Sequence, residues 1–495
     1  MPYRGKLSKA CQRCRARKLK CDLLPVSCSS CIRAHVLCTG YRDTQKLRIR
    51  DETDDVRRKA LTSTRNNSKT SFLSVQHFPL SLSFQAREAF FRFHVTEASK
   101  TWDFLLKFYH PQDAPEHLTL SLDAVSLAFL SHQKNSPAAL ISAREQYGSA
   151  LRMTTRALQC AEIAAKSTTI LSTLLLDMVE KITNLKHRRS DSWMSHISGA
   201  LALVTLEGLD HYRESDSLRV LGRLSTNLII SCIAGERPVP EHLIVLRKHV
   251  VAQLNASDSK TKLTELMIEY GTLRARVRSG WLSVAECLHE TLELDAKLLA
   301  LSVNMPCEWR YETMVFQERS DRVFCGRVDI YSGRLVTQTW NVLRLVRILL
   351  NTSIIEYSFK HHISTDSLLL LIEVANGNIT SLVYEISASV PQYLDCLGPG
   401  RSASSTTNIH ACSSGTGHSP SHTLDCYTTI FPIFVAAYSQ EPNSSVRSWY
   451  IQQLRYMSNH FAIRNAGYVA QILEQDVKVD PWAVYAGLGS YAFAA

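Results

Sequence analysis

Near its N-terminus the chain carries six closely spaced cysteines, and residues 11–38 read CQRCRARKLKCDLLPVSCSSCIRAHVLC. The spacing Cys-x2-Cys-x6-Cys occurs twice at identical intervals, at Cys11, Cys14, Cys21 and then at Cys28, Cys31, Cys38. The repeat predicts one structural unit in duplicate. Two cysteines three residues apart lie on the same face of a helical turn, so both thiolates can reach a single metal ion.

The number of cysteines constrains the metal. Tetrahedral zinc takes four ligands, so two zinc ions need about eight ligand positions, whereas this stretch offers six thiolates. Six thiolates can fill all the ligand positions if two of the cysteines each bridge both ions. The cysteines therefore predict two Zn²⁺ ions per chain, held in two fused tetrahedra that share two sulfur atoms.

The residues between the cysteines differ in charge between the two halves. The second half offers only Arg33 and His35, whereas the first half carries Arg13, Arg15, Arg17, Lys18 and Lys20. One half is therefore a positively charged face and the other is mostly scaffold. A helix that is fixed by zinc and carries Arg and Lys suits the major groove of DNA and its flanking phosphates.

The stretch from Cys11 to Asp22, with the second Cys-x2-Cys and the final cysteine, resembles the fungal binuclear Zn2Cys6 transcription factors. The resemblance implies a DNA-binding domain over residues 8–40, with Cys11 and Cys28 as the bridging ligands and one zinc ion on each of the other four cysteines. It also implies that Lys18 reads a CGG-type triplet, because guanine O6 and N7 are paired acceptors in the major groove. Arg17 is the expected second base-reading residue. Phosphate contacts are expected from Lys9, Arg13, Arg15, Lys20 and Arg33.

Two flanking stretches, residues 3–6 and 47–53, resemble a filamentous-fungal branch of this family. That branch carries a large helical regulatory region behind the zinc cluster. The resemblance implies a nuclear, sequence-specific transcription regulator of the RNA polymerase II type that controls a metabolic or secondary-metabolite gene set. Its partners would be double-stranded DNA and the transcription machinery or co-regulators.

Other interpretations of the six cysteines fit less well. A disulfide framework needs an oxidising compartment, and no apolar signal-peptide region follows the basic residues 1–10. Two-zinc interaction modules of the RING or LIM type use eight ligands and lack this basic density. A redox Cys-x2-Cys belongs in a βαβ context. A zinc-stabilised protein–protein adaptor that does not bind DNA stays open as the alternative function.

The positive charge of the chain is concentrated at its N-terminus. Residues 1–50 hold thirteen of the 56 Lys and Arg but only two of the 45 Asp and Glu, which accounts for the whole net charge of +11. The remaining residues carry no net charge. The electrostatic attraction for a polyanion therefore lies in the first tenth of the chain. The basic run 13–20, with Arg57-Arg58-Lys59, is also expected to serve nuclear import.

Behind the cluster, residues 41–75 form a basic strip and a polar linker without apolar heptads. The absence of a coiled-coil pattern predicts a monomer, or a homodimer formed through the helical domain. Residues 76–495 are expected to form one all-α regulatory domain with a mobile loop over 397–423. The apolar spacing predicts helices at 85–109, 138–165, 168–186, 192–206, 215–234, 242–254, 260–303 with interruptions near Gly271 and Gly280, 332–355, 364–387, 426–438 and 445–463.

The sequence also lacks the patterns of several other protein classes. No stretch has the length and apolarity expected of a membrane span, so no membrane association is predicted. No glycine-rich phosphate loop, nucleophile elbow or His-Glu-x-x-His motif is found, so no enzymatic activity is expected. The aromatic residues of 84–109 are interpreted as core rather than as an effector pocket, because they follow helical spacing.

Overall fold

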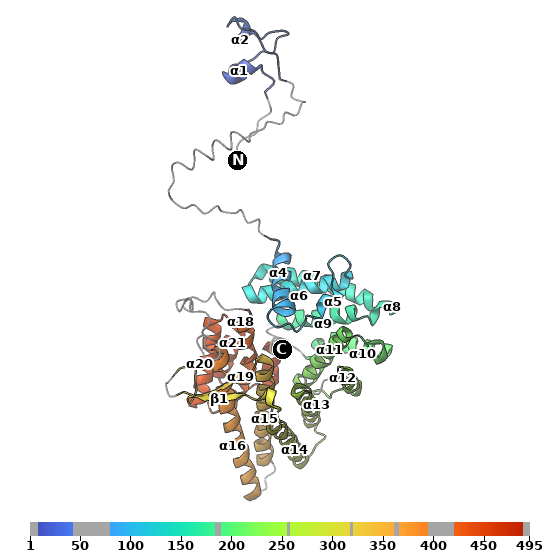
Figure 1. Cartoon of the computed structure of the whole chain (residues 1–495), viewed down its shortest axis with the longest axis vertical. Coiled ribbons are helices and arrows are strands. Elements are labelled where there is room, and N and C mark those ends of the chain that lie inside the picture. The colour runs from blue at the N-terminus through green and yellow to red at the C-terminus, as the bar shows by residue number, and fades with distance from the viewer. Residues whose placement is uncertain are drawn as a thin grey trace. The chain divides into compact units, whose positions relative to one another are not determined.

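In a computed structural model of the chain, the structure describes residues 8–42, 80–183, 190–254, 258–316, 320–360, 366–394 and 420–488. They belong to two compact units, Met1–Phe78 and Pro79–Ala495. The two units are drawn in Figure 1 and are considered separately below. Most of the predicted linker 41–75, the basic run 57–59 and residues 397–419 of the predicted mobile loop lie outside the described residues.

The N-terminal unit contains two short helices, α1 (Gln12–Ala16) and α2 (Ser29–Ile32). Within residues 8–42 the buried side chains are those of Cys11, Cys14, Cys28 and Cys31. A unit of this size cannot bury enough apolar surface to fold on its own. Its interior is made of sulfur, so its stability depends on what the sulfurs bind.

The two helices end in the same way. The Leu19 N–H donates to the Cys14 carbonyl at 2.8 Å, and the Val36 N–H donates to the Cys31 carbonyl at 3.2 Å. These are the long hydrogen bonds of a Schellman motif, which closes a helix through a left-handed residue. The two halves therefore repeat not only the cysteine spacing but also the backbone conformation at the end of each helix.

The C-terminal unit is mainly helical. Its first half contains α4 (Leu82–Phe90), η1 (Phe91–Thr96), α5 (Leu105–Phe108), α6 (Glu116–Lys134), α7 (Pro137–Leu158), α8 (Ala161–Ala164), α9 (Ser167–Thr183), α10 (Ser190–Glu207), η2 (Leu209–His211), α11 (Ser215–Ala234), α12 (Glu241–Gln253), α13 (Ser259–Arg278), α14 (Val284–Val303) and η3 (Cys307–Trp309). Its second half contains β1 (Glu312–Val315), β2 (Arg327–Ile330), α15 (Arg334–Lys360), α16 (Asp366–Ser389), α17 (Pro391–Leu394), α18 (Pro420–Thr428), α19 (Ile430–Tyr438), α20 (Ser445–His460), α21 (Arg464–Glu474) and α22 (Pro481–Leu488). The predicted mainly α fold is confirmed.

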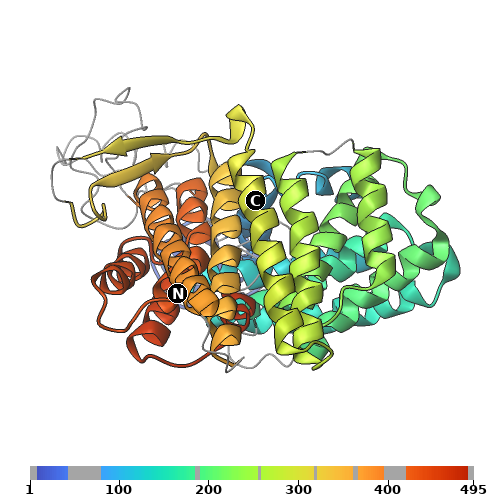
Figure 2. The same ribbon diagram turned by 90° about the horizontal axis from the view of Figure 1, so that it is seen from below.

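One continuous hydrophobic core runs through this unit from α4 to α22. The long helices α13, α14, α15 and α16 pack in sequence, each against the next, and Figure 2 shows them side by side. Charged groups join them inside the core. Arg347 Nε of α15 lies 2.8 Å from Asp295 Oδ1 of α14, and Arg344 Nε lies 2.9 Å from Glu385 Oε2 of α16.

Several predicted features of this unit are corrected. It is not all-α, because β1 and β2 form an antiparallel hairpin in which Glu312 faces Ile330. The predicted helix 85–109 is interrupted over 97–104, and within this interruption Lys100 has a φ of +54°, outside the right-handed helical region. The predicted loop 397–423 stops earlier, because α18 begins at Pro420, and proline favours the first position of a helix.

The two predicted interruptions of 260–303 have different outcomes. Gly280 separates α13 from α14 and has a φ of +68°, so the break there is confirmed. Gly271 lies inside the unbroken helix α13. A Cβ at Gly271 would stand 2.9 Å from Ile233 Cγ1 of α11. This glycine therefore permits close helix packing and does not end a helix.

One described segment, Asp366–Leu394, is long and apolar enough by length and composition to cross a membrane. The expectation that no such stretch exists is therefore wrong. From Asn378 onward, polar groups of α16 are hydrogen-bonded to α15. Asn378 Nδ2 donates to Asn351 Oδ1 at 3.0 Å, and Ser389 Oγ accepts from Asn341 Nδ2 at 3.0 Å. These contacts join the segment from Asn378 onward to the helical unit, whereas Leu369, Leu370 and Val374, which precede Asn378, are exposed.

Candidate metal centre and nucleic-acid interface

The six sulfur atoms of the N-terminal unit form two overlapping groups of four. The members are Cys11, Cys14, Cys21, Cys28 in one group and Cys11, Cys28, Cys31, Cys38 in the other. Within each group all sulfurs lie within 4.8 Å of one another. The two shared sulfurs are those of Cys11 and Cys28, the residues that the resemblance marks as bridging.

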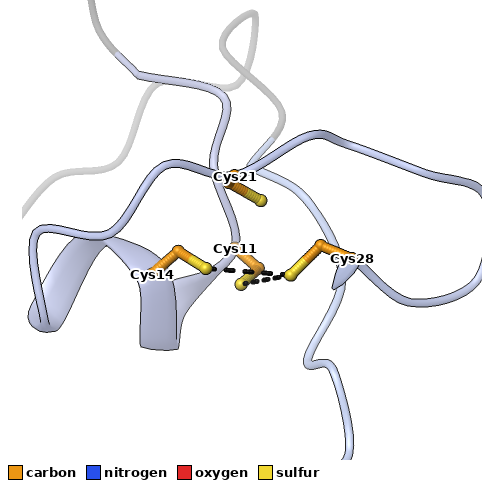
Figure 3. Close-up of side chains that lie close together, drawn as sticks. All are labelled: Cys11, Cys14, Cys21 and Cys28. Carbon is orange, nitrogen blue, oxygen red and sulfur yellow. Dashed lines mark hydrogen bonds between the residues drawn. The ribbon is translucent and has the colours of Figure 1, made fainter. Parts of the chain in front are cut away.

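The sulfur spacing fits tetrahedral zinc. The Sγ–Sγ distance is 3.8 Å for Cys11–Cys28, 3.7 Å for Cys14–Cys28 and 3.8 Å for Cys11–Cys31. A zinc–sulfur bond of about 2.3 Å gives a tetrahedron with edges of about 3.8 Å. Figure 3 shows the first group, with the side chains of Cys11, Cys14, Cys21 and Cys28 directed toward a common centre. A donor set made only of thiolates suits zinc.

The thiols need a cation to be ionised together. Burial raises the pKa of Cys14 well above its usual range and that of Cys31 to about 12, because a buried thiolate loses its solvation. Backbone hydrogen bonds from Cys28 and Gly40 lower the pKa of Cys38 to about 7. Two divalent metal ions would supply the positive charge that keeps the buried sulfurs as thiolates at neutral pH.

Polar contacts fix the two halves to each other. Arg13 Nη1 donates to the Ser30 carbonyl at 2.8 Å, and Ser30 Oγ donates to the Lys20 carbonyl at 3.0 Å. The Asp22 carboxylate accepts hydrogen bonds from both the backbone N–H and the hydroxyl of Ser29, which lowers the pKa of Asp22. The halves therefore hold one relative orientation, and part of the Arg13 guanidinium is committed to the scaffold.

These contacts were not expected from the sequence, and neither was a further contact from Tyr41. The Tyr41 hydroxyl donates to the Leu24 carbonyl and so ties the segment after the last cysteine to the loop between the triplets. Asp22 is seven residues from its partner Ser29, so no local helix-start pattern marks this contact. The other partners are far apart in sequence and have no spacing rule.

The predicted base-reading residues lie together at the C-terminal end of α1. Arg17 is the residue that caps α1, and Lys18 follows it with a left-handed φ of +51°. Both side chains are exposed. Positive charge at this end of a helix is also favoured by the helix dipole. The geometry leaves both side chains available to a ligand outside the unit.

The predicted phosphate-contacting residues differ in exposure. Lys9, Lys20 and Arg33 are exposed, whereas Arg13 and Arg15 are half-buried. Four of the five belong to the first half or its approach, and Arg33 caps α2 in the second half. The structure therefore brings most of the basic side chains to one half of the unit.

The duplicated backbone makes the two halves directly comparable, position by position, at an offset of 17 residues. His35 has a φ of +52°, which matches Lys18. The residues that occupy the second-half equivalents of Arg15, Arg17, Lys18 and Lys20 are Ile32, Ala34, His35 and Leu37. The same backbone thus carries fixed positive charge in one half and almost none in the other.

Comparison with known proteins identifies this unit. Residues 9–48 match the family model described as the fungal Zn(2)-Cys(6) binuclear cluster domain. No curated protein and no solved structure gives a significant match to the chain. The chain therefore carries the zinc-cluster domain of the fungal DNA-binding transcription factors, and this domain binds two zinc ions.

Proposed function

We propose that this chain is a sequence-specific transcription regulator of the RNA polymerase II type that acts in the nucleus. The observation that carries the proposal is the charge difference between two halves with the same backbone. Both halves present the same helical turn and the same left-handed closure. Only the first half offers a cluster of Arg and Lys, as a domain that docks one face on DNA requires.

In this proposal the zinc cluster is held by all six cysteines, Cys11, Cys14, Cys21, Cys28, Cys31 and Cys38. Cys11 and Cys28 bridge the two zinc ions, because their sulfurs belong to both groups of four. Zinc supplies the fold, and the protein side chains supply the DNA contacts. The domain would span residues 8–40 and be followed by the linker 41–75 and the regulatory domain 76–495.

Recognition of the bases falls to Lys18 and Arg17 at the end of α1, which would read a CGG-like triplet in the major groove. The exposure of both side chains at the C-terminal end of α1 supports this assignment, because it leaves their cationic groups available to the bases. Phosphate contacts would come from Lys9, Arg15, Lys20 and Arg33, together with those N–H groups of Arg13 that do not bond Ser30 or Cys31.

The proposal extends to the wider role of the chain. The helical unit would sense or transmit a signal to the transcription machinery or to co-regulators, and the controlled genes would belong to a metabolic or secondary-metabolite set. The chain would act as a monomer or as a homodimer through the helical unit, without spanning a membrane. Nuclear import would use the basic run 13–20. A fluorescent fusion of the full chain that stays in the cytoplasm would contradict the nuclear assignment.

The salt dependence of DNA binding separates this function from that of an adaptor. Five phosphate contacts release counterions and give a slope of about −4.5 in a plot of log affinity against log salt concentration. The full-length, zinc-loaded protein and a short duplex containing a CGG triplet provide the measurement. A slope near zero, or no binding at low salt, would instead favour the adaptor.

A further inference from the structure

A cavity of about 370 Å³ lies within the helical unit, between α11, α12, α13 and α15. Of these, α11 packs against both α12 and α13, and Figure 1 shows the three together. Each helix lines the cavity with one face. Arg247, Val250 and Val251 of α12 and its capping residue Leu254 line the cavity at the spacing i, i+3, i+4, i+7. The other three helices contribute faces of the same periodicity.

The charged residues of the lining are all basic. Arg219, Arg223, Arg247 and Lys260 line the cavity, and no Asp or Glu is among the described residues that do so. Arg219 is neutralised by an ion pair with Asp103 outside the lining. Arg223, Arg247 and Lys260 also line the space, and the rest of its lining is mostly aliphatic.

Arg223 has little polar compensation. Its Nη2 lies 3.4 Å from Thr101 Oγ1, and its guanidinium carbon lies 4.9 Å from the centre of the Trp102 ring. Burial lowers the pKa of Arg223 to about 10, an effect that the charges of Tyr485 and Asp177 reduce. A guanidinium that contacts an aromatic ring and one hydroxyl, with no ion pair among the described residues, can accept an anion as a further partner.

Arg247 also has few polar contacts. Its Nε is buried and has no hydrogen-bond partner among the described residues. The pKa of Arg247 is lowered by burial, an effect that the negative charges of Asp258 and Glu265 reduce. The Asp258 carboxylate caps α13 through the Thr261 N–H at 2.8 Å, and neither acid lines the cavity. A buried donor without a partner costs free energy that a ligand acceptor would recover.

A second cavity in the same unit provides a contrast. It encloses about 880 Å³ and includes Arg274 and Arg278 in its lining. Both cations are paired with Glu236, at 3.1 Å and 2.5 Å, and Arg274 also lies 3.2 Å from Asp480. Charge is balanced there by the protein itself, so that cavity gives no reason to expect an ionic ligand.

We propose that the cavity between α11, α12, α13 and α15 binds an organic anion, a carboxylate with an apolar body. Arg223, Arg247 and Lys260 would hold the carboxylate, since a guanidinium offers paired donors to its two oxygens. The aliphatic residues of the four helices and the Phe104 ring would contact the apolar body. The volume lies within the range of small-ligand pockets. This inference does not depend on the proposed DNA recognition.

The test uses two fluorescent probes with closely similar bodies and different charge. 8-Anilinonaphthalene-1-sulfonate is an apolar anion, and N-phenyl-1-naphthylamine is its neutral analogue. The full-length protein should bind the anionic probe saturably, one per chain, and about tenfold or more tightly than the neutral probe. Decanoate should displace the anionic probe, and decanol should do so about tenfold less well.

Variants locate the binding. Arg223→Gln and Arg247→Gln should each weaken the anionic probe by about tenfold or more and leave the neutral probe nearly unchanged. Lys248→Gln is the matched control, because Lys248 is the exposed neighbour of Arg247 on α12 and does not line the cavity. It should bind like the wild type. Circular dichroism and the thermal midpoint verify that each variant is folded.

A third variant blocks the space without removing charge. A Cβ at Gly222 would stand at an ordinary 3.6 Å from Val250 Cγ1, so a side chain can begin there. Because Gly222 lines the cavity, the side chain of Gly222→Leu is expected to fill part of it, and the fold of this variant is verified in the same way. It should weaken both probes. The proposal is overturned if folded Arg223→Gln and Arg247→Gln bind the anionic probe as the wild type does, or if Gly222→Leu leaves both affinities unchanged.

Discussion

At the scale of single residues, equivalent positions in the two halves of the zinc cluster have the same backbone but different side chains. Variants at such positions therefore test the side chain alone. Lys20 and Leu37 are equivalent positions, both exposed, with Leu37 92% exposed. Lys20→Ala should weaken binding to all DNA sequences alike and flatten the salt slope by about one unit. Leu37→Ala is the control and should leave the slope unchanged. An unchanged slope for Lys20→Ala would remove Lys20 from the phosphate contacts.

A buried histidine makes the helical unit sensitive to acid. His94 is fully buried, with its ring centre 4.8 Å from that of Phe90 and 4.7 Å from that of Phe93. Burial, and then the charge of Arg223, lower its pKa from 6.5 to about 3. Because the folded pKa is depressed, the contribution of His94 to stability is complete above pH 6.5 and is lost as the pH falls below that value.

Between pH values of about 7 and about 5.5, the wild type should lose about 1 kcal/mol more unfolding free energy than His94→Leu. Denaturant unfolding of both proteins at each pH gives this difference. Equal losses in the two proteins would show that His94 is not held neutral in the folded unit.

Residue-level prediction succeeds where the chemistry is local. The zinc content follows from the number and spacing of the cysteines. The contacts of Arg13 with Ser30 and of Asp22 with Ser29 join positions 17 and 7 residues apart, and no periodic pattern marks such pairs. Lys260 and Arg247 carry no motif either, so the cationic cavity appears only when four helices are brought together.

At the scale of elements, the sequence does not reveal a helix or strand whose apolar residues lack the regular spacing of that element. Strand β1 is exposed at all four positions, so it has no alternating pattern to reveal it. Helix α6, absent from the predicted helices, buries Ser121 and Ser131 among its apolar residues. Their hydroxyls donate to the carbonyls of His117 and Ala128 at 2.8 Å and 2.7 Å. The serines therefore interrupt the apolar pattern without interrupting the helix.

The contact between α14 and α15 should be sensitive to the loss of one charge. Asp295 accepts from Arg347 at 2.8 Å and from Asn351 at 3.1 Å, in a buried setting. Asp295→Ala leaves the buried Arg347 uncompensated and should destabilise the helical unit by about 3–5 kcal/mol. Lys297→Ala removes an exposed ion pair of α14 with Glu269 and should cost about 0–1 kcal/mol. Comparable losses in the two variants would contradict this account.

At the scale of the whole molecule, the two units have separate interiors, one of sulfur and one of apolar side chains. Removal of zinc by a chelator should therefore abolish DNA binding and leave the thermal transition of the helical unit unchanged. Metal analysis of the full chain should give two zinc ions. Loss of the helical transition on chelation would show that the units do not fold independently.

The central claim is that Lys18 gives the zinc cluster its sequence preference. The most direct measurement selects binding sites from random DNA with the zinc-loaded, full-length protein and with Lys18→Ala. Alanine keeps a Cβ, so the backbone cost of the positive φ at this position is little changed. We predict that the wild type enriches a CGG-like triplet, and that Lys18→Ala loses about 1–3 kcal/mol of affinity with relaxed preference at the guanines. Enrichment of no common triplet, or an equal loss of affinity across all sequences, would contradict the claim.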